Sequence, residues 1–390
     1  MRISPPLSLL LLGAIGCHHV ADVDSEALHF LQVSVLDDLP GTMDDPADFT
    51  AEAVTYRMKA EALDRDAASA KYGGTLSVKV QPGDLESTDE ITLTDGSWEG
   101  DVTIRYPFGN ARVWFTDDLG DGEVREPSYV TGVSDALWYE KPTIAQVQAT
   151  DDHEDNPLKG EYTEVRSDDR TVVIVATGQD GMWVTDLDDP PGEYNSLFIY
   201  TYNKPEYSTP EGDMAHEDIV YAEPGQQLAS LGGGNQEYLA TTQLSFPQYD
   251  FIDGAVHELP APLEITSETC SDDEAMEKFE GGLVVARDLE IPTFEYGVDS
   301  DFYSYGQWPI DFQDGRCTLY ASSTTQIPGF YPSEHIGSEL DYIQGMLTEV
   351  WGKWIILPRD ADDIPIYSES SRSAQGPARP KARARSALAL

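Results

Sequence analysis

The central part of the chain reads Thr171-Val-Val-Ile-Val-Ala176, then Met182-Trp-Val-Thr185, then Leu197-Phe-Ile-Tyr-Thr-Tyr202. These runs are short and rich in β-branched and aromatic residues, which is typical of strands. Their apolar residues are continuous rather than alternating, so both faces of each strand are expected to be covered, as in a strongly curved barrel. We therefore predict a small closed β-barrel over residues 142–262, beginning near 142–148.

The preceding region, residues 30–141, predicts an all-β domain of another kind. Apolar and polar residues alternate over 75–80, 101–106 and 111–115, and turns that contain Gly and Asp separate these segments. Alternation indicates strands with one buried face. The spacing suits an immunoglobulin-like β-sandwich, which takes about 100 residues. A short helix is expected over residues 60–70.

Residues 263–366 predict a further β domain. Its strand segments are 281–286, 344–350 and 354–357, and Trp351-Gly352-Lys353 predicts a tight turn between the last two. Glycine precedes the apolar residues in both Glu280-Gly-Gly-Leu-Val and Gln344-Gly-Met-Leu-Thr, which allows the backbone to bend before each strand. The fold class expected for the whole chain is therefore all-β.

Several short motifs follow one another in a fixed order after the sandwich: Asn156-Pro-Leu-Lys-Gly160, Glu223-Pro-Gly-Gln-Gln227, Leu259-Pro-Ala-Pro-Leu263, Phe279-Glu-Gly-Gly-Leu-Val284 and Gly352-Lys-Trp-Ile-Ile-Leu-Pro-Arg359. In order and spacing, residues 142–364 resemble the OB-fold region that precedes the catalytic domain in secreted bacterial nucleases of the endonuclease/exonuclease/phosphatase type. The resemblance implies an OB-fold domain at 142–262 and a second OB-like domain at 263–366. The catalytic domain of that family has no counterpart before Leu390, so we expect no catalytic residues and a binding or spacer role.

The start of the chain has the features of an export signal. Residues 1–16 have a charged beginning, a short apolar run and small residues before Cys17, as a signal peptide does. Ala14-Ile-Gly-Cys17 resembles the lipobox of bacterial lipoproteins, which implies lipidation of Cys17 and an acidic tether over 17–29. His18 after that cysteine implies sorting to the outer membrane or cell surface. A plain secretory signal with another cleavage site is the alternative.

The two remaining cysteines, Cys270 and Cys317, are expected to form one disulfide, because exported proteins fold in an oxidising compartment. At the other end, residues 367–390 are rich in Ser, Ala, Pro and Arg and contain no acidic residue after Glu369. This basic tail is expected to be disordered.

The charge of the chain limits its partners. Asp and Glu total 71 against 24 for Lys and Arg, a formal net charge of −47, which repels a phosphate backbone. Nucleic acid is therefore an unlikely partner without divalent cations. We expect a non-catalytic binding or scaffold module on the cell surface, held to the membrane by its lipid, with an envelope or extracellular protein or glycan as partner. The alternatives are an accessory or degenerate nuclease component that binds nucleic acid through divalent cations, and a hydrolase built around His216 or His257.

Calcium is the one cofactor that the sequence suggests. Carboxylates around a glycine turn could supply several of the six to eight oxygen ligands that Ca²⁺ takes, and the candidate ligands are Asp117, Asp118, Asp121 and Glu123. The spacing is not that of an EF-hand, and an acidic β-turn is the alternative. Two other carboxylate clusters, at 151–155 and 186–189, are expected to be a solvated charge run and a turn.

Overall fold

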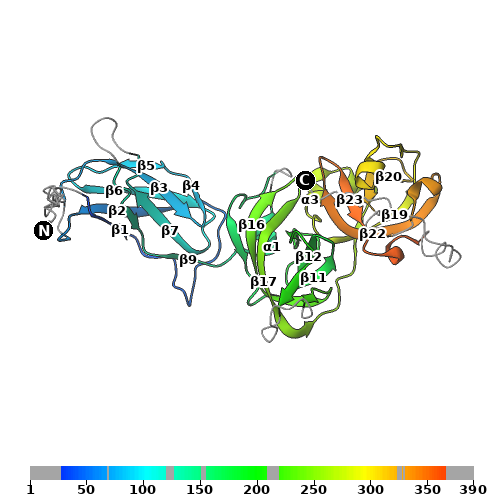
Figure 1. Cartoon of the computed structure of the whole chain (residues 1–390), viewed down its shortest axis with the longest axis horizontal. Helices are drawn as coiled ribbons and strands as arrows, with labels where there is room; N and C mark the ends of the chain where they lie inside the picture. Colours follow the sequence, from blue (N-terminus) through cyan, green and yellow to red (C-terminus); the bar gives the residue numbers. More distant parts are fainter. Residues whose placement is uncertain are drawn as a thin grey trace, which may run out of the picture.

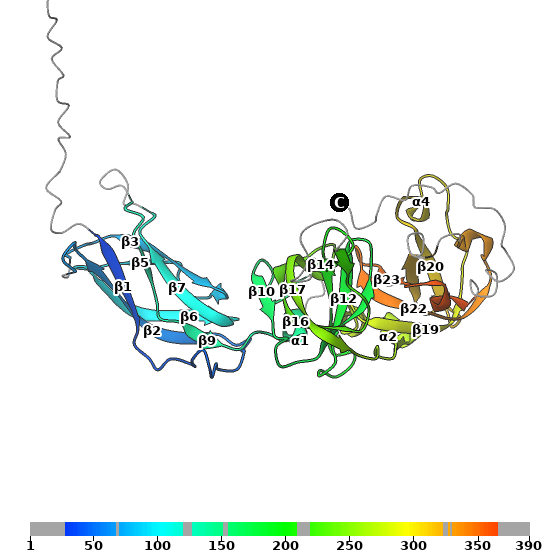
Figure 2. The same ribbon diagram turned by 60° about the horizontal axis from the view of Figure 1, so that its bottom comes forward.

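The computed structural model describes residues 28–67, 70–119, 127–150, 155–208, 219–322, 327 and 330–365. Within these residues the protein is all-β, with a few helices of three to five residues. The strands form three groups that follow one another along the chain and lie in a row (Figures 1 and 2).

The first group is a β-sandwich. Its strands are β1 (Phe30–Val35), β2 (Val54–Leu63), β3 (Thr75–Gln81), β4 (Asp84–Leu85), β5 (Glu90–Thr92), β6 (Ser97–Arg105), β7 (Gly109–Thr116), β8 (Thr131–Val133) and β9 (Leu137–Tyr139). One sheet has the order β1-β2-β6-β4; the other has the order β5-β3-β7-β8, with β9 also paired to β7. Apolar side chains of both sheets, among them Met58, Leu76 and Phe115, share one core.

The prediction of a helix over residues 60–70 is wrong, because strand β2 continues to Leu63. Met58, Ala60 and Ala62 are all fully buried, while the residues between them are more exposed. Burial therefore repeats every second residue, as a strand on one face of a sandwich requires.

The second group is a small closed barrel. Its strands are β10 (Tyr162–Val165), β11 (Val172–Thr177), β12 (Gly181–Asp186), β13 (Ser196–Tyr200), β16 (Gln226–Glu237) and β17 (Thr242–Val256), and a separate hairpin is made by β14 (Glu206–Ser208) and β15 (Ile219–Tyr221). The sheet order is β10-β16-β11-β12-β13-β17, and pairing of β16 with β17 closes a five-stranded ring. Ile174, Val184 and Leu197 are buried in its core.

The barrel is preceded by a helix where the sequence had suggested the first strand. Helix α1 (Ile144–Gln148) begins after Thr143, whose side chain accepts a hydrogen bond from the Gln146 amide while the Gln146 side chain accepts one from the Thr143 amide. This capping box stabilises the first turn. Ile144 and Val147 then pack into the barrel core.

The third group is a second closed barrel. Its elements are β18 (Leu263–Ile265), α2 (Ser267–Cys270), α3 (Asp273–Glu277), β19 (Leu283–Glu290), α4 (Asp301–Tyr305), β20 (Gln307–Phe312), β21 (Thr318–Ser322), η2 (Pro332–Glu334), β22 (Glu339–Glu349), β23 (Trp354–Leu357) and η3 (Ala361–Asp363). The order is β18-β19-β20-β21-β23-β22, and β19 pairs with β22 to close the ring. The expected disulfide joins Cys270 to Cys317.

The two barrels have one topology. Counted in chain order, the ring strands are arranged first, second, third, fifth and fourth, and the fourth returns to the first. In each barrel the third and fifth strands are parallel. Because the third and fifth strands are parallel and the fourth strand pairs with the first, neither ring is a simple up-and-down meander.

An apolar interface joins the barrels. Val173, Val175, Trp183 and Phe198 on the outer face of the first barrel form one buried cluster with residues of the second, which are Leu283 and Met346, with Leu357 packed against them. The continuous apolar runs of β11, β12 and β13 therefore have two separate causes. One face of each strand fills the first barrel, and the other face contacts the second barrel.

Candidate functional site

An exposed tryptophan occupies the turn between β22 and β23. Trp351 and Gly352 are the two central residues, with φ of 53° and 73°, and the Val350 and Lys353 amides and carbonyls bond to each other at 3.0 and 3.2 Å. Positive φ at both positions defines a type I′ turn, which normally takes Asn-Gly or Gly-Gly. A bulky residue in this conformation is strained, and such strain concentrates at functional sites. The Trp351 side chain is nevertheless 61% exposed.

Other rings and two charges lie beside this tryptophan. The Tyr305 ring meets the Trp351 ring nearly at a right angle, with centroids 6.3 Å apart. Lys353 Nζ lies 5.0 Å from the centre of the Tyr320 ring and 2.5 Å from Asp301 Oδ2. We call these residues the aromatic face: Asp301, Tyr305, Tyr320, Trp351 and Lys353. Flat apolar surfaces with a few fixed polar groups are the ordinary elements of a ligand site.

In the first barrel, the outer face of the corresponding strands is covered by the second barrel. The second and third strands of the first barrel, β12 and β13, carry Trp183 and Phe198, which are buried against the second barrel. Its turn between the fourth and fifth strands also has two residues of positive φ, Leu239 and Ala240. That turn docks on the second barrel, where the Trp351 amide donates to the Leu239 carbonyl at 3.1 Å. The two turns therefore contact each other through their backbones, while the Trp351 residue stays largely exposed.

A pocket lies between the sandwich and the first barrel. This open pocket of about 630 Å³ is lined by residues that include Asp84, Tyr106, Thr150, Asp155, Lys159 and Tyr194. Lys159 Nζ lies 2.9 Å from Asp155 Oδ1. Burial, with a smaller contribution from Glu86, raises the pKa of Asp84. Residues 151–154, which connect two of the lining residues, lie outside the described part of the chain.

The candidate calcium ligands are only partly described. Asp117 is fully buried, and its Oδ2 accepts hydrogen bonds from the amide and the hydroxyl of Ser128 at 2.8 and 2.5 Å. Asp118 is half-buried, while Asp121 and Glu123 fall outside the described residues. No group of three or more His, Cys, Asp or Glu side chains within the described ranges is arranged to hold a metal ion. The calcium loop stays a prediction.

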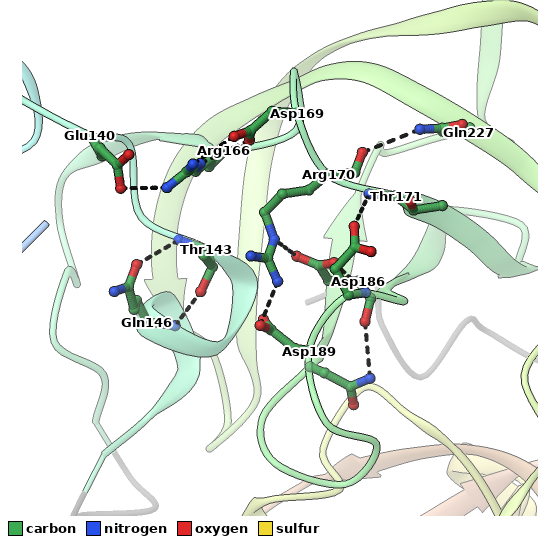
Figure 3. A network of polar contacts seen from close by, with 12 residues as sticks. Glu140, Thr143, Gln146, Arg166, Asp169, Arg170, Thr171, Asp186, Asp189 and Gln227 are labelled. Atoms are coloured by element: carbon green, nitrogen blue, oxygen red, sulfur yellow. Dashed lines mark hydrogen bonds and ion pairs between the residues drawn. The ribbon is translucent and has the colours of Figure 1, made fainter. Parts of the chain in front are cut away.

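The carboxylates at 186–189 belong to a buried ion-pair network, shown in Figure 3. Arg170 donates from Nε to Asp186 Oδ2 and from Nη2 to Asp189 Oδ1. Asp188 Oδ2 accepts from the Thr171 amide at 2.6 Å. This cluster connects the start of β11 with the end of β12, so its role is structural.

The other residues singled out in the sequence are dispersed. Cys17 and His216 lie outside the described residues. His257 Nε2 is 2.8 Å from Gln227 Oε1, and Asp155 is the one member of the 151–155 run that is described. Within the described chain no helix is long and apolar enough to cross a membrane.

Sequence reasoning predicted the turn of Trp351 but did not assign its tryptophan to a site. The signal was available, since a tryptophan at the tip of a two-residue turn cannot point into the hairpin that the turn connects. It also missed a group of glutamates at the joint between the barrels, which come from separate parts of the chain: the half-buried Glu237 and the buried Glu277, Glu280 and Glu349. No local pattern could have found these.

No known protein family, curated protein sequence or solved structure matches the chain. The fold and the aromatic face are therefore the basis for any statement about function.

Proposed function

We propose that the protein is a non-catalytic binding module that is anchored to the cell surface by a lipid on Cys17. In this proposal the aromatic face of the second barrel binds a neutral glycan. The sandwich and the first barrel act as the arm that carries this face away from the membrane.

The topology supports finer assignments of the three domains. Two sheets around one core suit an immunoglobulin-like sandwich. A five-stranded ring with the fourth strand returning to the first suits an OB-like barrel, a fold that binds oligonucleotides and oligosaccharides through the face of its second and third strands and the adjoining loops. The resemblance of residues 142–364 to nuclease OB-fold regions agrees with this assignment.

One observation carries the proposal. The outer face of the second and third strands is covered in the first barrel, by contacts of Trp183 and Phe198. On the second barrel the corresponding strands lie beside Trp351, which is exposed and strained. The Trp351 amide holds the turn against the first barrel, but the exposed indole takes no part in that hydrogen bond and so is accessible to a ligand.

The chemistry of the face favours a neutral glycan. Aromatic rings pack against the apolar faces of sugar rings, and Asp301 and Lys353 offer an acceptor and a donor for hydroxyl groups. The net charge of −47 disfavours anionic polymers. For the same reason, nucleic acid would require divalent cations to bridge it to this surface.

The test is affinity gel electrophoresis of the purified protein against a panel of neutral polysaccharides. Trp351→Ala is expected to abolish the retardation that the wild-type protein shows with one or more of them. Tyr129→Ala is the matched control, because Tyr129 is also an exposed aromatic residue of positive φ but lies on the sandwich. Equal retardation of wild type and Trp351→Ala would overturn the assignment of the face.

A parallel measurement addresses the alternative. Fluorescence anisotropy of labelled single-stranded DNA is followed with calcium and magnesium, then with EDTA. We expect no change in either condition. A rise that requires metal would favour the accessory nuclease component, and a fall below the starting anisotropy would show cleavage and refute a non-catalytic role.

A further inference from the structure

Four glutamates meet at the joint between the two barrels. Glu237 ends β16 of the first barrel, Glu277 ends α3, Glu280 follows that helix, and Glu349 ends β22 of the second barrel. The side chains of Glu277, Glu280 and Glu349 are 3%, 1% and 1% exposed. The charges of other members of the set act on Glu277 and on Glu280. We call these residues the glutamate quartet.

The hydrogen bonds of the quartet are incomplete. Glu237 Oε2 accepts from Asn156 Nδ2 at 3.0 Å and from Thr242 Oγ1 at 2.7 Å. Glu280 Oε2 accepts from the Thr242 amide at 3.0 Å. Among the described residues, three buried carboxyl oxygens have no hydrogen-bond partner: Glu237 Oε1, Glu277 Oε2 and Glu280 Oε1. Buried polar atoms are nearly always satisfied, so each of these oxygens requires a hydrogen-bond donor.

Among the described residues, Lys159 is the one positive charge that acts on Glu237, Glu277 or Glu280. Lys159 acts on Glu237 but is paired with Asp155, whose charge acts in the opposite direction. The charged groups that act on Glu277 are Glu237 and Glu349, and those that act on Glu280 are Glu277, Glu237 and Glu349. Several ionised carboxylates cannot share a buried site without compensation.

Protons are the ligand that fits this arrangement. The described carboxylates are not arranged to hold a metal ion. Burial, with the charges of Glu237 and Glu349, raises the pKa of Glu277 to about 8. Burial, with the charges of Glu277 and Glu237, raises the pKa of Glu280 well above its ordinary value. A protonated carboxyl can donate its own hydrogen bond to a neighbouring carboxyl oxygen, as in other carboxyl pairs that share protons.

The quartet adjoins the contacts that hold the barrels together. Thr241 Oγ1 lies 2.9 Å from Thr348 Oγ1 and 2.5 Å from the carbonyl of Glu349, which links the first barrel to the second. The Thr242 amide, next along β17, bonds to Glu280. Deprotonation of the quartet would therefore place negative charges on both sides of this contact, and these charges would repel each other.

We propose that the glutamate quartet is a proton-binding site that closes the joint between the two barrels, and that loss of its protons above neutral pH loosens that joint. The proposal does not depend on which ligand the aromatic face binds. Because the pKa of Glu277 is raised in the folded protein, its contribution to stability is complete below about pH 4.5 and is lost as the pH rises through about 8. Between the ordinary pKa of 4.5 and the raised value of about 8, each pH unit shifts the equilibrium between closed and open joint by up to tenfold per group, and the shift levels off above about pH 8.

The experiment is hydrogen exchange by mass spectrometry on the full chain at pH 6 to 9, corrected for intrinsic exchange. Peptides that contain Thr242 and Gly281 report on the joint, since both amides are hydrogen-bonded across it or beside it. We expect wild-type protection in these peptides to fall at least tenfold between pH 7 and 9. Glu277→Gln, which keeps the shape without the charge, is expected to remove most of this fall.

Two further variants make the result decisive. Glu280→Gln is expected to act in the same direction as Glu277→Gln, so failure of either variant to fold leaves the other informative. Glu274→Gln is the matched control, since it removes an exposed carboxylate from the same helix and should retain the wild-type pH dependence. Unchanged pH dependence in the folded Gln variants would refute the proposal. Full restoration of protection at pH 9 by added calcium would also refute it, because the ligand would then be a metal.

Discussion

Arg170→Met would remove the cation from the most deeply buried ion pair of Figure 3. The Arg170 and Asp189 side chains are each 17% exposed, and that of Asp186 is fully buried. Methionine keeps most of the volume and the apolar stem of arginine while it removes the charge and the two hydrogen bonds. Asp186 then keeps the Asp188 amide at 3.0 Å as a donor to Oδ1, and its Oδ2 loses the guanidinium.

The magnitude follows from burial. Removing one member of a buried ion pair leaves an uncompensated charge and lowers the free energy of unfolding by about 3–5 kcal/mol. Burial already raises the pKa of Asp186 in the wild-type protein, and the Arg170 guanidinium opposes this rise. Without Arg170 the pKa rises further, so Asp186 takes up a proton as the pH is lowered. The deficit should thus be largest near pH 7 and shrink toward pH 4.

The assay is urea unfolding followed by tryptophan fluorescence at pH 7 and pH 4.5. Arg316→Met is the control, since Arg316 is exposed and its Nε lies 3.6 Å from Asp314 Oδ2; its unfolding midpoint should equal that of the wild type. Arg170→Met combined with Asp186→Asn should recover much of the loss at pH 7, because the fully buried one of the two unpaired carboxylates, Asp186 and Asp189, is then neutral. The electrostatic explanation would be refuted if Arg170→Met lowered the free energy of unfolding by less than about 1 kcal/mol, or if its difference from the wild type did not change with pH.

Three other predictions concern the anchor, the disulfide and the barrel interface. Cys17→Ser should move the protein from the membrane fraction to the soluble fraction, and continued membrane retention would exclude the lipid anchor. Alkylation of the unfolded protein should label Cys270 and Cys317 only after reduction, as mass spectrometry would reveal; labelling without reduction would contradict the bridge. Trp183→Ala should lower the free energy of unfolding by about 3–5 kcal/mol through loss of a buried indole. Trp351→Ala should leave the free energy of unfolding nearly unchanged. Similar losses in both variants would contradict the assignment of Trp183 to the barrel interface and of the Trp351 side chain to the surface.

The all-β class could be predicted from short-range pattern, and its exceptions have physical causes. Alternating apolar residues indicate a strand with one buried face, and continuous apolar runs indicate a strand with two. Such patterns occur where the structure has β3, β7, β11, β12 and β19. Residues 60–70 were misassigned because the partner that buries Ala60 and Ala62 is another sheet, which local sequence does not specify. Residues 142–148 were misassigned because the capping box of Thr143 and Gln146 was overlooked.

The candidate site was less accessible to sequence reasoning. The turn at Trp351-Gly352 could be predicted, but exposure of the tryptophan depends on which barrel face the neighbouring domain covers. The glutamate quartet draws on residues from 237 to 349, and their proximity is a result of tertiary packing. Long-range convergence of this kind leaves no periodic signal in one sequence.

The interface between the barrels determines how the chain can be divided. A fragment of residues 142–262 would present Val173, Val175, Trp183 and Phe198 to water as one apolar patch, and such patches promote self-association. A fragment that ends after the second barrel keeps the patch covered. We therefore expect the smallest soluble piece downstream of the sandwich to contain both barrels, which would then unfold as a single cooperative unit.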